Sequence, residues 1–226
     1  NSPANPTGAV YTPDELRSLV DWAERRGLWV ISDEIYHGLS EGGREPSALE
    51  FSPRAVVVDG FSKRYAMTGW RLGWCVAPDE LVRPLQKLQQ NLMVCAPAPS
   101  QAAALAALEH GEPYVRAMAQ AYAERRRAMV AGLQELGLTV AGRPEGAFYV
   151  LADARHLGRN SIELAFTILE EAGVALTPGV DFGFRGEGHL RFSYAASLDT
   201  IREGLRRLSA WLSGRPQAEV ACAEAE

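Results

Sequence analysis

The sequence LWVISDEIY occupies residues 28–36, and the sequence AVVVDGFSK occupies residues 55–63. Each stretch opens with four apolar residues and continues into polar ones. Short runs that are apolar throughout are typical of strands buried on both faces of a parallel sheet. We therefore expect buried strands at residues 28–31 and 55–58, and a third strand at residues 72–76.

The segment before the first strand carries the signals of a helix. Thr12, Pro13 and Glu15 form a capping box with proline at the first helical position. Gly27 is a residue that commonly ends a helix. Strands that alternate with helices predict an α/β fold, in which a mostly parallel sheet forms a three-layer domain with helices on both faces.

The pattern becomes helical from residue 80 onward. Short strands and helices then alternate as far as residue 212, which predicts a smaller C-terminal α+β domain. The polar end of the chain is expected to fray. We therefore expect part of a large domain over residues 1–111, a connecting helix over 112–136, a small domain over 137–213 and a flexible tail over 214–226.

Composition excludes several classes of function. The 23 Lys and Arg residues against 28 Asp and Glu give a net charge of −5, which argues against nucleic-acid binding. Cys75, Cys95 and Cys222 have neither CxxC nor zinc spacing, so we expect free thiols and no metal site. No apolar run approaches the roughly 20 residues that span a bilayer, and no signal peptide is recognisable. We expect no membrane partner and a cytoplasmic location.

Polar side chains follow both apolar runs. Ligands of open parallel sheets bind outside the carboxyl ends of the strands, so Asp33, Tyr36, Ser62 and Lys63 should converge on one crevice, with Asn5 nearby. A lysine amine in a partly dry crevice has a lowered pKa and can form Schiff bases. Taken singly, however, such residues are more often a solvated lysine, a turn-capping aspartate and a packed tyrosine.

Four segments together resemble one enzyme family. FSKRYAMTGWRLGW (residues 61–74) resembles the cofactor-lysine signature of the class I and II aminotransferases, which are fold type I enzymes dependent on pyridoxal phosphate (PLP). NSPANPTG (1–8), SDEIY (32–36) and LRFSYA (190–195) match the same family in the same order. The resemblance implies part of the large PLP-binding domain followed by a small domain. It also implies that the chain is the C-terminal part of a longer protein, which is a homodimer when complete.

The resemblance assigns roles to individual residues. Lys63 would form the Schiff base with the cofactor aldehyde and then transfer a proton. Asp33 would pair with the pyridine nitrogen, and Tyr36 and Asn5 would hydrogen-bond the phenolic oxygen, with Asn5 also near the substrate. The cofactor phosphate would be anchored by Ser62 and Arg71.

Two arginines, Arg71 and Arg191, are expected to bind anionic groups. Arg71 follows Trp70 in what reads as an apolar strand, where an unpaired guanidinium is costly, so a buried ion pair is its alternative. Arg191 resembles the family arginine that grips the substrate α-carboxylate through two hydrogen bonds. Without the resemblance, Arg191 is typical of a sheet edge.

Two further stretches are ambiguous. The sequence GAFY at residues 146–149 matches a family segment near the substrate pocket, although it also fits a plain core strand. The glycine-rich run at residues 179–188 lacks GxGxxG spacing and leads into a strand, so we interpret it as a loop.

The function that the resemblance implies is transfer of an amino group from an amino acid to a 2-oxo acid through a PLP Schiff base. One alternative is a β-eliminating C–S lyase, or a related PLP lyase, on the same fold. Another is a degenerate domain that acts as the sensor of a transcription regulator.

Overall fold

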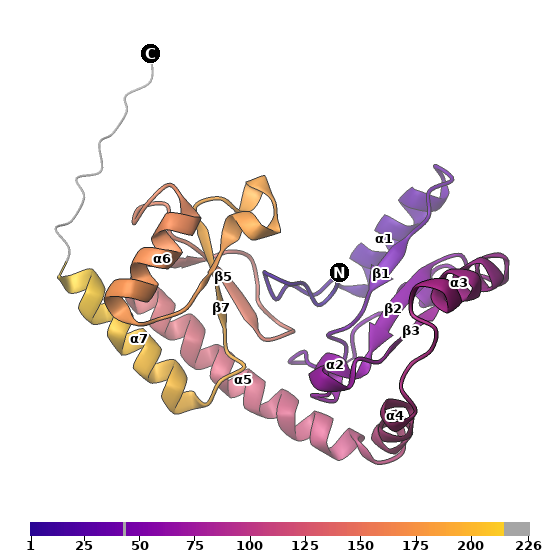
Figure 1. Cartoon of the computed structure of the whole chain (residues 1–226). Coiled ribbons are helices and arrows are strands. Elements are labelled where there is room, and N and C mark those ends of the chain that lie inside the picture. The colour runs from indigo at the N-terminus through magenta and orange to yellow at the C-terminus, as the bar shows by residue number, and fades with distance from the viewer. Residues whose placement is uncertain (43, 215–226) are drawn as a thin grey trace. The chain divides into compact units, whose positions relative to one another are not determined.

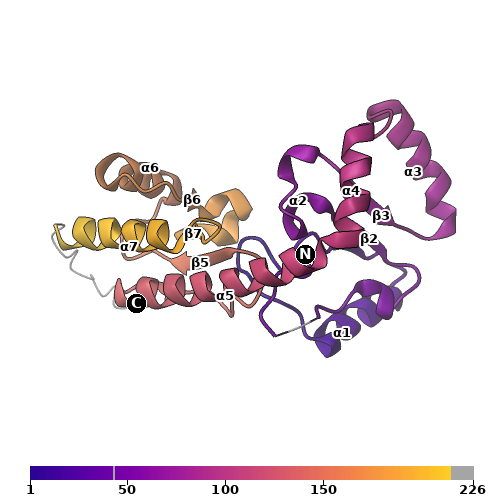
Figure 2. The same ribbon diagram turned by 90° about the horizontal axis from the view of Figure 1, so that it is seen from below.

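The computed structural model describes residues 1–42 and 44–214, which divide into two compact units. Unit 1 contains residues 1–5, 9–121 and 145–147, and unit 2 contains residues 6–8, 122–144 and those from 148 onward. Figure 1 shows the elements of both units, and Figure 2 shows them from below. The tail expected from residue 214 lies outside the described residues, except for Gly214. The domain boundaries expected at residues 111, 136 and 213 remain a proposal.

Unit 1 contains a three-stranded sheet in the order β1-β2-β3. Its helices include α1, whose Thr12 and Glu15 form the expected capping box: Thr12 Oγ1 accepts from Glu15 N at 3.3 Å and Glu15 Oε2 accepts from Thr12 N at 2.8 Å. The elements are α1 (Pro13–Glu24), β1 (Ile31–Asp33), β2 (Val56–Gly60), α2 (Phe61–Arg64), β3 (Gly73–Val76), α3 (Asp79–Leu92), α4 (Ala98–His110) and the first part of α5 (Glu112–Glu135), with 3-10 turns η1 (Ala48–Glu50) and η2 (Thr68–Trp70).

The sequence predicts no direction for the third strand, and the structure shows it. β1 and β2 pair in parallel, whereas β2 and β3 pair antiparallel, with Gly60 opposite Gly73. A parallel return needs a crossover connection of about a dozen residues or more, usually containing a full helix. The link from β2 to β3 holds only the short elements α2 and η2, so the chain turns back beside β2.

The expectation that the first strand is buried on both faces is wrong. β1 begins only at Ile31, whose side chain is 69% exposed. One face of the sheet packs against a core of Leu16, Val20, Ala48, Ala55 and Val57. The opposite face carries Ile31 and Val58 and is left open by the described elements of unit 1.

Unit 2 has a four-stranded antiparallel sheet in the order β4-β5-β7-β6, flanked by helices. α5 and α7 run side by side in both views (Figures 1 and 2), and a Cβ at Gly132 of α5 would overlap Leu205 of α7. The core includes Leu133, Val150, Ile168, Leu190 and Tyr194. The elements are β4 (Thr139–Val140), β5 (Tyr149–Asp153), α6 (Ser161–Ala172), β6 (Thr177–Pro178), η3 (Gly179–Phe182), η4 (Phe184–Gly186), β7 (His189–Ser193) and α7 (Leu198–Ser213).

Candidate active site

The carboxyl ends of β1 and β2 meet at one edge of the unit 1 sheet. Asp33 is the last residue of β1 and lies opposite Val58 of β2, and Glu34 N donates to Val58 O at 2.9 Å. Asp33 Oδ1 accepts from Ile35 N at 3.2 Å. In the part of the chain that the structure describes, Asp33 Oδ2 has no hydrogen-bond partner. A free, exposed carboxylate oxygen can accept a proton or a charged donor.

Lys63 lies in the helical turn α2, which begins immediately after β2. β3 approaches the residue before this turn so closely that a Cβ at Gly60 would lie 3.0 Å from the Cα of Gly73. Lys63 is half-buried, and its amine has neither an ion-pair nor a hydrogen-bond partner within residues 1–42 and 44–214. The hydroxyl of Ser62 likewise has no partner in the described residues. Both groups are thus available to a ligand.

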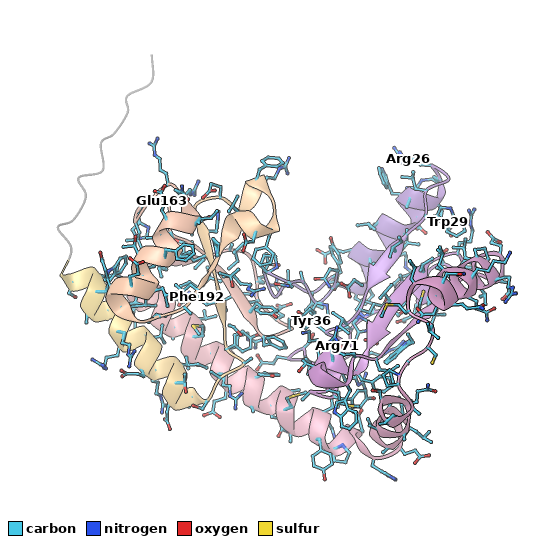
Figure 3. All side chains as sticks on the ribbon, in the orientation of Figure 1. Arg26, Trp29, Tyr36, Arg71, Glu163 and Phe192 are labelled. Atoms are coloured by element: carbon cyan, nitrogen blue, oxygen red, sulfur yellow. The ribbon has the colours of Figure 1, made fainter. Side chains whose placement is uncertain are left out.

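Tyr36 lies in the turn that follows β1 and is only 4% exposed. Burial of a tyrosine so close to a strand end fixes the position of its ring. Figure 3 labels this residue.

The segment that carries Asn5 is attached to the end of β1 by a residue that the sequence reasoning missed. Asn1 Nδ2 donates to Asp33 O at 3.1 Å, and Asn1 Oδ1 accepts from Asn5 N at 2.7 Å. Ser2 N also donates to Asp33 O at 3.2 Å. One primary amide therefore joins two of the expected site residues, Asp33 and Asn5. In the sequence, the position of Asn1 four residues before Asn5 is the only indication of this link.

Glu34 organises the loop after β1 and was also missed. Its buried carboxylate accepts hydrogen bonds from Ser32 Oγ at 3.0 Å, Ser47 Oγ at 3.1 Å and Ala48 N at 2.9 Å. His37 Nδ1 lies 3.5 Å from Glu34 Oε2. A buried carboxylate with several donors is a stable arrangement, and it fixes the turn that contains Tyr36.

Asp59 lies on β2, four residues before Lys63. Burial raises the pKa of Asp59 from 3.8 to about 6, while the hydrogen bond from Gly60 N and the proximity of His37 act in the opposite direction. Gly60 N donates to Asp59 Oδ1 at 2.6 Å. A carboxyl group with this pKa changes its charge at mildly acidic pH.

Arg71 is not where the sequence suggested. It follows η2 in a left-handed conformation with φ of 52°, before β3 begins, and it is exposed. Its Nη1 donates to Thr68 O at 2.7 Å (Arg71 is labelled in Figure 3). The expectation of a buried strand position, with a buried ion pair as its alternative, is therefore wrong. Exposure instead leaves the guanidinium edge accessible to an anion.

Arg191 belongs to unit 2, whereas the other expected site residues belong to unit 1. It lies on β7, which is paired with β5 on one side and β6 on the other, so the alternative of a sheet-edge arginine is wrong. Its Nη2 donates to Thr177 Oγ1 at 3.0 Å. The guanidinium carbon lies 4.3 Å from the centre of the Tyr149 ring.

The described residues contain neither a metal-binding cluster nor a helix that could span a membrane. Among the described residues, no group of three His, Cys, Asp or Glu side chains is arranged to hold a metal ion. No helix in residues 1–42 and 44–214 has the length and apolar character needed to cross a bilayer.

Comparisons with known proteins agree on one family. The family model for aminotransferase class I and II matches residues 1–208. The (5-formylfuran-3-yl)methyl phosphate transaminase of Methanocaldococcus jannaschii is 41% identical over 94% of this chain and 56% of the relative. The valine–pyruvate aminotransferase of Mycobacterium tuberculosis is 41% identical over 93% of this chain and 55% of the relative.

Solved structures support the same relationship. The crystal structure of an aminotransferase from Mycobacterium tuberculosis superposes with a TM-score of 0.89 at 40% identity, covering 95% of this chain and 56% of the other. The expected α/β fold, with its large-domain part and smaller C-terminal domain, is thereby confirmed. The chain spans about half the length of the curated relatives that it matches. With a family model that matches 208 residues and relatives that share its fold, this chain belongs to the aminotransferase class I and II family.

Proposed function

We propose that the complete protein is a PLP-dependent aminotransferase that moves an amino group from an amino acid to a 2-oxo acid. The observation that carries the proposal is the amine of Lys63, half-buried and without an acidic partner in the described residues, at the sheet edge where β1 ends in Asp33. An amine that condenses with an aldehyde must be able to lose its proton, so an ion pair there would oppose the reaction.

The residues of unit 1 fit the chemical groups of PLP. When bound, the cofactor supplies an electron sink for the substrate carbon that loses its proton. The free Oδ2 of Asp33 would accept a hydrogen bond from the pyridine N–H and keep that nitrogen protonated. Tyr36 and Asn5 would donate to the phenolic oxygen, and the Lys63 amine would accept and return the proton of the substrate.

Ser62 and Arg71 serve as phosphate ligands in this proposal. The hydroxyl of Ser62 is free in the described residues, and the exposed guanidinium of Arg71 retains donors beyond the one that bonds Thr68 O. A guanidinium can give two parallel, charge-assisted hydrogen bonds to phosphate oxygens.

Arg191 serves as the ligand of the substrate α-carboxylate in this proposal, because a guanidinium can also give two parallel hydrogen bonds to a carboxylate. Asn5 contributes a second contact to the substrate. The amino acid and the 2-oxo acid are small molecules, so the proposal involves neither nucleic acid nor membrane. Homodimer formation is a further proposal that rests on the family resemblance, and a cytoplasmic location remains a proposal as well.

The cofactor lysine can be identified by covalent labelling, and Lys87, the second lysine of this sequence, provides a control. Borohydride reduction of the complete protein with PLP should attach the pyridoxyl group to the peptide that contains Lys63. Lys63→Ala should abolish turnover and the visible cofactor absorbance, while the exposed-lysine control Lys87→Ala should still be labelled at Lys63. Labelling elsewhere, or turnover by Lys63→Ala, would refute the proposal.

Transamination and elimination differ in their products. The relatives described above are named as a transaminase and an aminotransferase, which favours transamination over the lyase. Incubation with an amino acid alone should convert the cofactor to pyridoxamine phosphate and release a 2-oxo acid. Release of pyruvate and ammonia from a cysteine conjugate, without pyridoxamine phosphate, would favour the lyase.

A further inference from the structure

The guanidinium of Arg191 lies close to two aromatic rings, both from unit 2. Its central carbon is 4.3 Å from the centre of the Tyr149 ring and 4.9 Å from the centre of the Phe182 ring. Tyr149 is buried in β5, beside β7, whereas Phe182 is half-buried at the end of η3. Both distances are within the range of cation–π attraction.

A hydrogen bond to Thr177 restricts rotation of the Arg191 guanidinium in its own plane. Thr177 of β6 lies opposite Arg191 of β7, and its hydroxyl oxygen accepts from Nη2 at 3.0 Å. Two rings restrict tilting of the guanidinium, and the hydroxyl restricts its rotation in the plane. The side chain, which is flexible when solvated, is thereby held in one orientation.

Phe182 is held in position by the glycine-rich run at residues 179–188, to which neither the sequence reasoning nor the proposed function gives a role. Gly179 and Gly186 touch backbone to backbone, and a Cβ on either one would overlap the carbonyl of the other. Gly183 N donates to Val180 O, and Gly186 N donates to Gly183 O, both at 2.9 Å. These contacts fold the run into two short turns, with Phe182 as the last residue of the first turn.

A carboxylate joins this loop to the start of α6. Glu187 Oε1 accepts from Ser161 N at 2.6 Å and from Gly188 N at 2.9 Å. These hydrogen bonds lower the pKa of Glu187, the one from Ser161 N having the largest effect. The loop is therefore anchored at the end that leads into β7.

From this geometry we propose that Phe182 is a positioning residue that, with Tyr149, orients Arg191 for the substrate carboxylate. The inference rests on the proposed function of Arg191. Rings that pack against the guanidinium favour the approach of a carboxylate edge-on, in the guanidinium plane, which is the approach that allows two parallel hydrogen bonds. The rings also stabilise the cation without offering a competing carboxylate partner.

The test compares two phenylalanines of the same loop in the complete protein. Phe182→Leu keeps an apolar side chain but removes the ring, whereas Phe184→Leu alters a ring that is 82% exposed and is the control. For the amino acid that the wild type uses best, Phe182→Leu should raise KM by about two- to thirty-fold, the range that a cation–π contact implies. Both kcat and the cofactor absorbance should stay unchanged, and Phe182→Tyr should restore KM.

Binding without turnover provides an independent readout. The deaminated analogue of that amino acid carries the carboxylate but no amine, and its Kd can be measured from the change in cofactor absorbance. Phe182→Leu should weaken this Kd by the same factor as KM, while Phe184→Leu should not. Thr177→Val replaces the hydroxyl with a methyl group and should weaken Kd by a smaller factor. This variant tests the orientation of Arg191 even if Phe182→Leu fails to fold.

The role of Arg191 and the positioning role of Phe182 can be tested separately. If Arg191→Lys leaves KM for amino acids unchanged, the proposed role of Arg191 is wrong. If Arg191→Lys raises KM but Phe182→Leu behaves like Phe184→Leu, only the positioning inference is overturned. A fall in kcat with unchanged KM in Phe182→Leu would also overturn it.

Discussion

Asp59 shows how one buried group makes stability depend on pH. Burial raises its pKa from 3.8 to about 6, so the folded protein binds this proton more tightly than the unfolded chain does. The contribution to stability is therefore complete below about pH 4 and is lost as the pH rises through 6. Asp59→Asn removes the charge and keeps an oxygen that can accept from Gly60 N.

We predict that Asp59→Asn is more stable than the wild type at pH 8, by about 1 kcal/mol after allowance for solvent screening. The difference should disappear below about pH 4. Urea unfolding at several pH values measures it, with Asp181→Asn at an exposed aspartate as the control. A stability difference that is the same at all pH values would contradict the assigned pKa.

At the scale of elements, β2 and β3 approach each other closely beside the candidate site. A Cβ at Gly73 would lie 2.8 Å from the carbonyl oxygen of Asp59, so backbone atoms would have to move. We predict that Gly73→Ala destabilises the protein by about 1–3 kcal/mol, as overpacked sites do. It should also weaken PLP binding, because β2 leads directly into the turn that carries Lys63.

Gly69 offers a matched control for this prediction. It lies in η2, in the same connection, and a Cβ there would meet nothing within 4 Å. Thermal unfolding measures the stability of the Gly73→Ala and Gly69→Ala variants, and PLP titration measures their affinity for the cofactor. Equal behaviour of Gly73→Ala and Gly69→Ala would show that the close approach of the strands is dispensable.

At the scale of the whole molecule, the two units have separate cores. Leu133 of α5 is fully buried in the core of unit 2. Leu133→Ala should cost about 2–5 kcal/mol through lost burial and the cavity left behind. Hydrogen exchange of the β5 and β7 amides measures the loss locally, and Leu169→Ala, at a site 44% exposed, should change it little. Similar effects of the two substitutions would show that Leu133 is not central to this core.

Short-range features were predictable from the sequence because their causes are local. The capping box of α1 depends on residues three positions apart, and the helix expected at 112–136 coincides with α5 within a residue. The family follows from four motifs in order, and the family comparison confirms it. The roles assigned to Lys63, Asp33 and Arg191 remain predictions.

Features that depend on partners distant in sequence appeared only with the tertiary structure. Whether β3 runs parallel or antiparallel depends on the space that its connection allows, and the exposure of Arg71 depends on where that strand begins. Of the two rings near Arg191, that of Tyr149 comes from β5, far from β7 in sequence, and that of Phe182 comes from the loop that leads into β7. A pattern of residues determines which groups are present and which turns they favour, but only packing determines what each group faces, because burial and orientation are properties of neighbours brought together by folding.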